Sequence, residues 1–239
     1  MRRPAAAALC AGLLLLAGCM GPAGQQRPEP ADGRAQDPAH PAGRPRPPVV
    51  DHVPTRDPVV FLTYDDGAER APRFVRLVRD RRLPVSMFLT DNVVGPGYGH
   101  FARLRAVGAS LQNHTLDHPV LRGLPYAGQR AEICGQQHKL RSRFGVRPTL
   151  LRPPHGAYDA VTLRAAADCG ISAVVLWRAS LGPDGVLTYT RGGPGLRRGD
   201  IVSVPSGGTA SPTLTDRTLR LLGEIEEQGL RVGRLEDYL

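Results

Sequence analysis

Two adjacent aspartates follow a short apolar run near residue 60. The run Val59-Val60-Phe61-Leu62 leads directly into Thr63-Tyr64-Asp65-Asp66-Gly67. At a strand end the chain leaves the regular pleat, so both carboxylates can face one pocket. One carboxylate can then bind a cation while the other acts as a base, and the cation favours the ionised form of both. An Asp-Gly turn is the structural alternative, because that dipeptide is common in turns.

Two histidines four residues apart follow a later apolar run. His114 and His118 lie in the segment Asn113-His114-Thr115-Leu116-Asp117-His118-Pro119. In a helical turn this spacing puts both rings on one face, where they can bind one metal ion. Together with Asp66 they predict a site of two imidazoles and one carboxylate with open positions. This donor set favours Zn²⁺, with other divalent metals as alternatives. Helix-start caps or surface histidines are the competing interpretation.

Arg152 and His155 lie in a third polar segment, Leu151-Arg152-Pro153-Pro154-His155-Gly156. Two prolines and a glycine predict a rigid, irregular loop that presents backbone groups. Arg152 can hold a carboxylate through a bidentate pair. The alternative is an ordinary loop at the exit of a strand, with a solvated arginine.

Alternating strands and helices must position these three clusters. Apolar patterning predicts strands at 59–62, 85–89, 109–112, 149–151, 172–177 and 201–204, and helices at 74–81, 101–107, 127–143, 157–169 and 214–228. Repeated strand–helix units predict a mainly parallel sheet or barrel, with functional residues at the carboxyl ends of the strands. A full eightfold barrel takes about 250 residues. Because the domain is shorter than this, we expect a reduced or distorted (β/α) barrel.

The first 56 residues differ in composition from the rest. Arg2 and Arg3 precede an apolar run and the sequence Leu16-Ala17-Gly18-Cys19, which is similar to a bacterial lipobox. We therefore expect residues 1–18 to be a lipoprotein signal peptide. Cys19 would then carry the lipid that anchors the exported protein to the outer face of the cell membrane, facing the wall. An ordinary secretory signal is the alternative. Residues 19–56, rich in Pro, Gly, Ala and Gln, predict a disordered tether before a domain at 57–239.

Charge and cysteine content are consistent with an exported domain. The chain of 239 residues has a net charge of +9, and residues 57–239 hold 24 basic and 18 acidic side chains, spread along the sequence. No basic block is interleaved with aromatic residues, which argues against nucleic acid as a partner. A mildly basic surface facing an anionic cell wall accounts for the charge. Cys134 and Cys169 could form a disulfide outside the cytosol or stay buried thiols. We expect a monomer.

The three clusters together resemble the polysaccharide deacetylases of the NodB homology domain, also called carbohydrate esterase family 4. The resemblance extends over essentially the whole predicted domain and rests on the Thr-x-Asp-Asp, His-Thr-x-x-His and Arg-Pro-Pro sequences. It implies a distorted (β/α) barrel, with Asp65 as the catalytic base and Arg152 orienting it. The backbone N–H of His155 would help to hold the oxyanion. The resemblance also implies three metal ligands: Asp66, His114 and His118.

The reaction that this resemblance implies is metal-assisted removal of acetyl groups from a glycan. Asp65 would take a proton from water, and a general acid would protonate the departing amine. The expected substrate is peptidoglycan or a chito-oligosaccharide, with acetylated xylan as another choice. Tyr64 and Trp177 are candidates for lining the substrate groove.

The general acid is where the sequence departs from the family pattern. The family carries an Asp-Trp element and then a strand ending in Leu-x-His, whose His is the acid. Here Trp177 is kept, but Leu176 precedes it and no Asp-Trp follows, so the carboxylate that orients the acid is absent. Pro205 stands where the His is expected, and a proline side chain cannot carry a proton. His155, found where the family usually has an aromatic residue, is the nearest candidate for another acid. The alternative is a lipoprotein that binds metal and glycan without turnover. A metallopeptidase is disfavoured, because no His-Glu-x-x-His sequence occurs.

Overall fold

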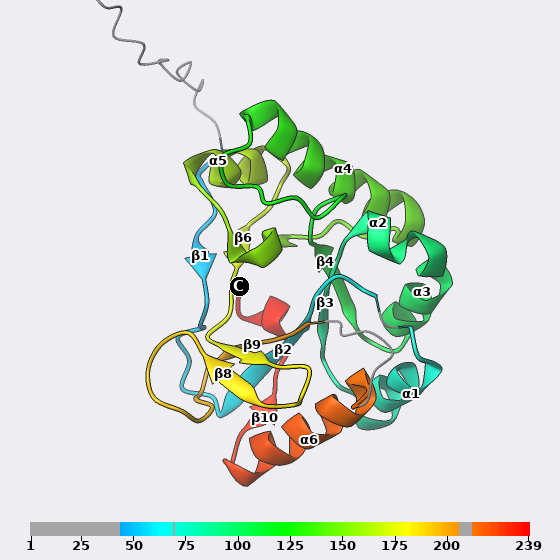
Figure 1. The fold of residues 1–239 in the computed structure, drawn as a ribbon, viewed down its shortest axis with the longest axis vertical. Coiled ribbons are helices and arrows are strands. Elements are labelled where there is room, and N and C mark those ends of the chain that lie inside the picture. Colours follow the sequence, from blue (N-terminus) through cyan, green and yellow to red (C-terminus); the bar gives the residue numbers. More distant parts are fainter. Residues whose placement is uncertain (1–43, 69, 206–211) are drawn as a thin grey trace, which may run out of the picture. The chain divides into compact units, whose positions relative to one another are not determined.

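Figure 1 shows the computed structural model, which describes residues 44–68, 70–205 and 212–239. Within these residues the strands are β1 Val49–Val50, β2 Val59–Tyr64, β3 Ser86–Leu89, β4 Ser110–Asn113, β5 Leu150–Leu151, β6 Ala173–Val175, β7 Ala179–Leu181, β8 Leu187–Tyr189, β9 Ile201–Val204 and β10 Arg231–Val232. The α-helices are α1 Pro72–Arg81, α2 Asp91–Val94, α3 Tyr98–Ala106, α4 Tyr126–Phe144, α5 Ala160–Asp168 and α6 Leu214–Glu227. Short 3₁₀ helices are η1 Gly95–Gly97, η2 Pro154–Gly156 and η3 Leu235–Asp237.

The strands form one sheet in the order β1-β6-β5-β4-β3-β2-β9-β7-β8, with β10 paired to β2. Neighbouring strands are parallel, except for the antiparallel hairpin of β7 and β8. Parallel strands need helical crossovers, which here cover the outside of the curved sheet (Figure 1). The expectation of a distorted (β/α) barrel is confirmed.

The segment before β2 helps to close this barrel. Val49 and Val50 pair with β6, and the Val53 N–H then donates to the Gly199 carbonyl at 2.8 Å, just before β9. The Val53 side chain is buried. The predicted tether at 19–56 is therefore wrong for residues 44–56, which belong to the folded domain. Their strand has only two residues and depends on a partner distant in sequence, so no local pattern marks it.

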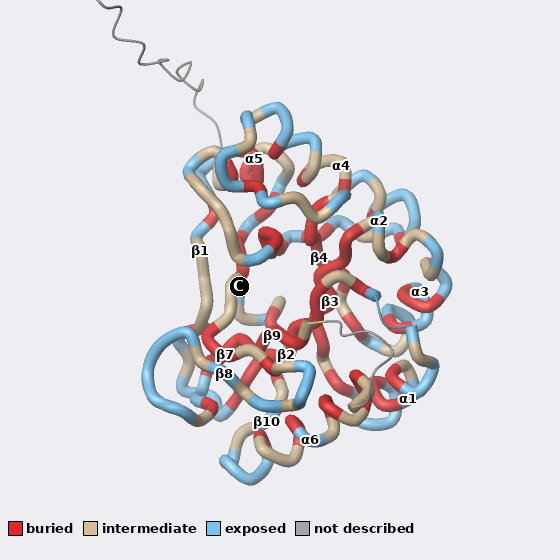
Figure 2. Tube along the Cα trace, in the orientation of Figure 1, coloured by how far each residue is buried: buried red, intermediate tan, exposed pale blue. Residues whose placement is uncertain are grey.

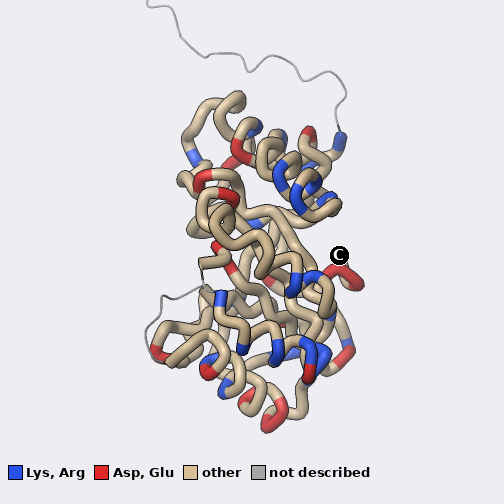
Figure 3. The backbone as a smooth tube through the Cα atoms, turned by 90° about the vertical axis from the view of Figure 1, so that its right-hand side faces the viewer, with Lys and Arg blue, Asp and Glu red and all other residues tan. Residues whose placement is uncertain are grey.

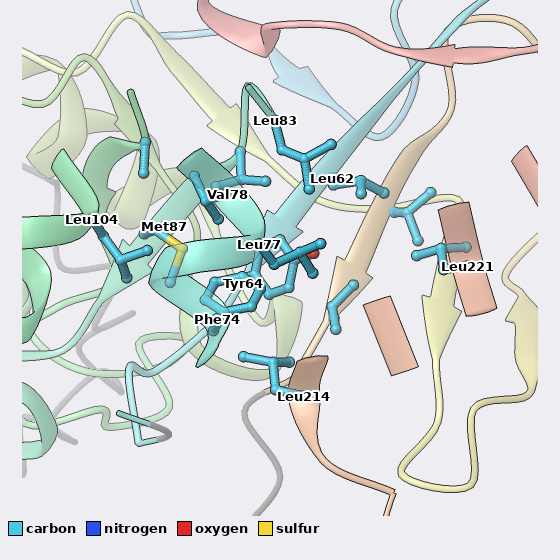
Figure 4. Packing of buried hydrophobic residues seen from close by; sticks show 14 of the residues in the cluster. Leu62, Tyr64, Phe74, Leu77, Val78, Leu83, Met87, Leu104, Leu214 and Leu221 are labelled. Atoms are coloured by element: carbon cyan, nitrogen blue, oxygen red, sulfur yellow. The ribbon is translucent and has the colours of Figure 1, made fainter. Parts of the chain in front are cut away.

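Apolar side chains from the helices pack on the outer face of the sheet. The buried positions coloured red in Figure 2 follow the central strands. Figure 4 shows Phe74, Leu77 and Val78 of α1 beside Leu62 and Tyr64 of β2. The helical spacing of these α1 residues gives the helix one apolar face, which is why it packs here.

Tyr64 belongs to this core and does not line a substrate groove. Its side chain is fully buried, and its hydroxyl lies 3.1 Å from Thr218 Oγ1 of α6. Alternation along β2 sends Tyr64 outward toward α1 and α6, on the opposite face from Thr63. Burial raises the pKa of its phenol above the ordinary value. The prediction that Tyr64 lines the groove is therefore wrong.

The helix expected at 157–169 begins later, at Ala160. Asp159 caps it by accepting a hydrogen bond from the Thr162 N–H, in a reciprocal capping box. Residues 157–159, which were expected to be helical, are irregular and follow η2. The predicted signal peptide and Cys19 lie outside the described residues. Among the helices that the structure does describe, none is both long enough and apolar enough to cross a membrane.

Candidate metal and catalytic site

Three predicted ligands converge at the carboxyl ends of β2 and β4. Asp66, His114 and His118 each offer one ligand atom, and these atoms all lie within 4.8 Å of one another. Asp66 Oδ1 is 3.3 Å from His114 Nε2 and 3.1 Å from His118 Nε2. The two Nε2 atoms are 3.2 Å apart. Residues from two different strand ends therefore surround one point.

His114 is held with one ring nitrogen directed at this point. The residue follows β4 and is buried, and its Nδ1 lies 2.7 Å from the carbonyl oxygen of Arg152. A carbonyl can only accept, so Nδ1 carries the proton. The neutral ring then has its lone pair on Nε2, which is the state a metal ligand needs.

His118 is positioned by a loop and not by the helical turn that its spacing suggested. Residues 114–118 are irregular, and Thr115 and His118 have φ values of 70° and 61°. The N–H groups of Leu116 and Asp117 both donate to Glu132 Oε2 of α4, at 3.1 and 3.0 Å. The predicted helical geometry is therefore wrong, although the two rings do meet. Glu132 was missed by the sequence analysis because it lies outside every motif.

Asp66 occupies a tight turn after β2. Its φ is 63°, and Gly67 follows with a φ of 85°. A Cβ at Gly67 would lie 2.5 Å from Val94 Cγ1, so the turn requires glycine both for its φ and for space. Burial raises the pKa of Asp66, but the neighbouring imidazoles of His114 and His118 outweigh this and hold it below the ordinary value. The hydrogen bond to Asp66 raises the pKa of His118.

The arrangement fits a divalent metal ion. Asp66 Oδ1 is buried, and apart from the two imidazoles it has no hydrogen-bond partner in the described residues. A buried carboxylate oxygen is costly unless something compensates it. Two imidazole nitrogens and one carboxylate oxygen are donors that Zn²⁺ and similar ions accept.

Asp65 lies beside this cluster and is held from two sides. Arg152 Nη1 donates to its Oδ1 at 2.6 Å, and the Ser203 hydroxyl donates to its Oδ2 at 2.7 Å. The expected bidentate pair is therefore wrong. The other guanidinium nitrogens of the buried Arg152 donate to the carbonyls of Val175 and Leu176.

Ser203 is a site residue that the sequence analysis did not identify. It lies on β9 and pairs with Thr63 of β2. In a parallel pair, residues in register point to the same face, so Ser203 faces the interior next to Asp65. The register between two strands about 140 positions apart cannot be read from the sequence.

A hollow of about 380 Å³ adjoins the cluster. Its wall includes Trp177 and His155, and an exposed ion pair between Asp51 and Arg191 borders it. The rings of His155 and His118 meet edge to face, with centroids 4.9 Å apart. His155 is exposed and has a φ of 57°. Trp177 and His155 therefore line one hollow, and His155 connects it to the metal ligands through its contact with His118.

Pro205 follows β9 at the same end of the barrel. The Asp65 N–H donates to the carbonyl of the preceding Val204 at 3.4 Å. The Pro205 carbonyl accepts a hydrogen bond from Nη2 of the buried Arg217 at 3.2 Å. A residue without a titratable side chain thus ends the strand beside Asp65.

Cys134 of α4 and Cys169, which caps α5, form a disulfide. Of the two states considered from the sequence, the structure has the bridge.

Comparison with known proteins gives a consistent set of similarities. Residues 52–174 match the family described as polysaccharide deacetylase. The chain is 65% identical to an uncharacterized protein of Streptomyces coelicolor over 99% of this chain and 98% of that one. It is 22% identical to the peptidoglycan-N-acetylglucosamine deacetylase of Bacillus cereus over 80% of this chain and 92% of that one. A carbohydrate esterase family 4 pseudoenzyme from Bacillus anthracis has the same fold, with a TM-score of 0.67 and 16% identity, over 80% of this chain and 69% of that one.

Proposed function

Because the chain belongs to the polysaccharide deacetylase family, we propose that it is a metal-dependent hydrolase that removes N-acetyl or O-acetyl groups from a cell-wall or related polysaccharide. The observation that carries this proposal is that a set of metal ligands lies next to a carboxylate held by an arginine. Asp66, His114 and His118 surround one point, and the Asp65–Arg152 pair lies beside them. Metal ligands next to a positioned carboxylate are what hydrolysis by activated water requires.

The metal site is assigned to Asp66, His114 and His118, with Zn²⁺ as the ion that the donor set favours. When bound, a divalent ion supplies Lewis acidity: it polarises the acetyl carbonyl and lowers the pKa of a water molecule. The ligands themselves are fixed by their surroundings, His114 by the Arg152 carbonyl and the His118 loop by Glu132.

Asp65 is assigned as the base that takes a proton from the attacking water. Water oxygen bonds to the acetyl carbon, the bond from that carbon to the sugar nitrogen breaks, and the amine leaves with a proton. Arg152 and Ser203 hold the two carboxylate oxygens of Asp65, so the base is oriented before the substrate arrives. The backbone N–H of His155 is assigned to the developing oxyanion.

His155 is the candidate for the proton donor to the leaving amine. Its imidazole contacts His118 and lines the hollow beside Trp177. Pro205 cannot serve, because it has no ionisable group. General acid assistance is worth about 10² to 10⁴ in rate, so without it turnover would be slow.

The sugar binds in the hollow beside Trp177. An aromatic side chain offers an apolar face for a sugar ring, and polar groups of Asp51, Thr190 and Arg191 border the same space. The substrate class is an N-acetylglucosamine-containing glycan, with peptidoglycan or chito-oligosaccharide ahead of acetylated xylan. The relative from Bacillus cereus bears the name of a peptidoglycan deacetylase.

A second candidate function is favoured by Pro205. If no other acid replaces the expected His, the domain binds metal and glycan without turnover. The metal ligands and the hollow would then serve recognition alone.

The proposal places the protein on the outer face of the cell membrane. Residues 1–18 act as the export signal, and Cys19 carries the lipid. The disulfide between Cys134 and Cys169 supports an oxidising location, because such bridges are rare in the cytosol.

Acetate release from peptidoglycan and from chito-oligosaccharides, assayed side by side, tests the proposal. Protein loaded with Zn²⁺ should release acetate, and a chelated sample should not. Asp65→Asn should lower the rate by about 10² to 10⁴ while equilibrium dialysis still finds bound metal. The matched control is Asp80→Asn, an exposed aspartate of α1, which should behave as wild type.

Each result separates the candidates. His155→Phe should slow acetate release if His155 is the acid, and an unchanged rate removes that assignment. Asp66→Ala or His114→Ala should abolish metal binding. Glycan binding without acetate release from the metal-loaded protein would establish the second candidate.

A further inference from the structure

A basic hollow of about 430 Å³ lies beside the C-terminal half of α4. Its wall carries the guanidinium groups of Arg44, Arg141 and Arg147 and the imidazole of His138. Among the described residues, no carboxylate lines it. In Figure 3, several backbone positions of Lys and Arg, coloured blue, lie near the point where the described chain begins.

These arginines are exposed and lack counter-charges. None of Arg44, Arg141 and Arg147 forms an ion pair with any carboxylate in the described part of the chain. A neighbouring hollow of about 450 Å³ shares Arg44 and Gly170 and adds Arg46 to the same face. Arg46 is also absent from every ion pair of the described residues. Four uncompensated positive charges around two adjoining hollows create a local field that attracts anions.

The basic face lies at the opposite end of the barrel from the metal ligands. Thr149 lines the first hollow and immediately precedes β5, whereas Arg152 follows β5 at the catalytic end. Gly170 likewise precedes β6, which is parallel to β5. The amino ends of these strands therefore open onto the basic face, and their carboxyl ends open onto the catalytic site.

The N-terminal part of the chain also joins the domain at this face. Arg44 is the first described residue, and it forms part of both hollows. Cys19, the expected lipid attachment point, lies 25 positions before it in the sequence. An anchor at Cys19 would therefore be connected to the end of the barrel that carries the unpaired arginines.

We propose that this face, defined by Arg44, Arg46, Arg141 and Arg147, docks on the phosphate headgroups of anionic membrane lipids. This docking proposal rests on the proposed membrane attachment, because attachment makes membrane lipid the nearest source of phosphate. Basic side chains at a membrane surface bind anionic lipids through this charge complementarity. Docking turns the catalytic end away from the bilayer and toward the glycan.

Vesicle flotation with the unlipidated, disulfide-bonded mature chain, residues 19–239, tests the docking face without the anchor. Cys19→Ser removes the lipid, and the vesicles contain either phosphatidylcholine alone or phosphatidylcholine with phosphatidylglycerol. We expect binding only to the vesicles that contain phosphatidylglycerol, and weaker binding as salt screens the charges. The triple variant Arg44→Ala, Arg141→Ala, Arg147→Ala should bind about a hundredfold more weakly.

The matched control removes the same charge elsewhere. Arg76→Ala, Arg81→Ala and Arg105→Ala alter exposed, unpaired arginines of α1 and α3, and this triple variant should float as the parent does. Equal loss of binding in both triples would overturn the docking face. So would equal binding to both kinds of vesicle, or binding to a soluble phosphodiester polymer with none to vesicles.

The outcome is independent of the proposed catalysis. Flotation reads binding alone, so a protein that releases no acetate can still dock, and an active deacetylase can fail to dock. Thermal unfolding of both triple variants checks that each is folded at the assay temperature.

Discussion

His100 of α3 links the stability of this domain to pH. Its side chain is 4% exposed, and neither ring nitrogen has a hydrogen bond among the described residues. Burial, with smaller contributions from Arg103 and Arg70, lowers the pKa of its imidazole to about 4. The ring packs edge to face against Phe101, an apolar environment in which the charged form is poorly solvated.

The folded state therefore disfavours the protonated form of His100. The unfolded chain takes up the proton near pH 6.5, so stability is full above that value and falls as the pH drops toward 4. From pH 7.5 to pH 5 the expected loss from this residue is about 2 kcal/mol. Urea denaturation at the two pH values measures it. Between pH 7.5 and pH 5, His100→Leu should lose less stability than wild type does. His138→Leu, a control at an exposed position, should lose as much stability as wild type. If the free energy of unfolding fell equally with pH in wild type and in His100→Leu, His100 would not be the source of the pH dependence.

Residues of the site differ in how far the sequence predicts them. Asp66, His114 and His118 were predicted because their residue types at strand ends form a metal-ligand set together, although each motif alone also fits a turn or a helix cap. Ser203 was not, because its contact with Asp65 depends on the register of β9 against β2. Tyr64 was placed wrongly because adjacency in a motif says nothing about which face of the strand a side chain takes.

At the scale of elements, the loop after β4 depends on α4. Glu132 accepts hydrogen bonds from the N–H groups of Leu116 and Asp117, just before His118. Residues that orient ligands typically change metal affinity by about 10- to 100-fold when mutated. We therefore expect Glu132→Ala to weaken Zn²⁺ binding within this range. Glu132→Gln keeps one acceptor oxygen, so its Zn²⁺ affinity should lie between those of wild type and Glu132→Ala.

Equilibrium dialysis with Zn²⁺ measures this effect. Glu227→Ala, at an exposed position of α6, is the matched control and should bind metal as wild type does. If Glu132→Ala also bound the ion with unchanged affinity, the loop would hold its shape without α4.

Elements with a clear apolar pattern were predicted well, whereas several short strands were not. The boundaries of β9 and α6 follow those expected, because β9 buries all four of its side chains and α6 buries one face at helical spacing. β1, β7 and β8 have two or three residues each, which is too short for a local apolar pattern to mark them as strands. The wrong tether boundary at 44–56 has the same origin.

Across the whole domain, the disulfide between Cys134 and Cys169 fastens α4 to the end of α5. The two cysteines are 35 positions apart, and the closed loop contains the strand β5 and the segment with Arg152. A bridge of this span restricts the unfolded chain and stabilises the fold by about 3 to 4 kcal/mol in the chain-entropy account.

Replacing both cysteines tests whether the bridge supports the fold or the site. Cys134→Ala with Cys169→Ala should lower the free energy of unfolding by about 3 kcal/mol, as measured by urea denaturation. Reduction of the wild type should bring it to a similar stability, while a reductant should leave the double variant unchanged. Neither cysteine contacts a ligand in the described residues, so the folded variant should bind Zn²⁺ as wild type does. A loss of metal affinity without loss of stability would instead make the bridge part of the site, acting through α4 and Glu132.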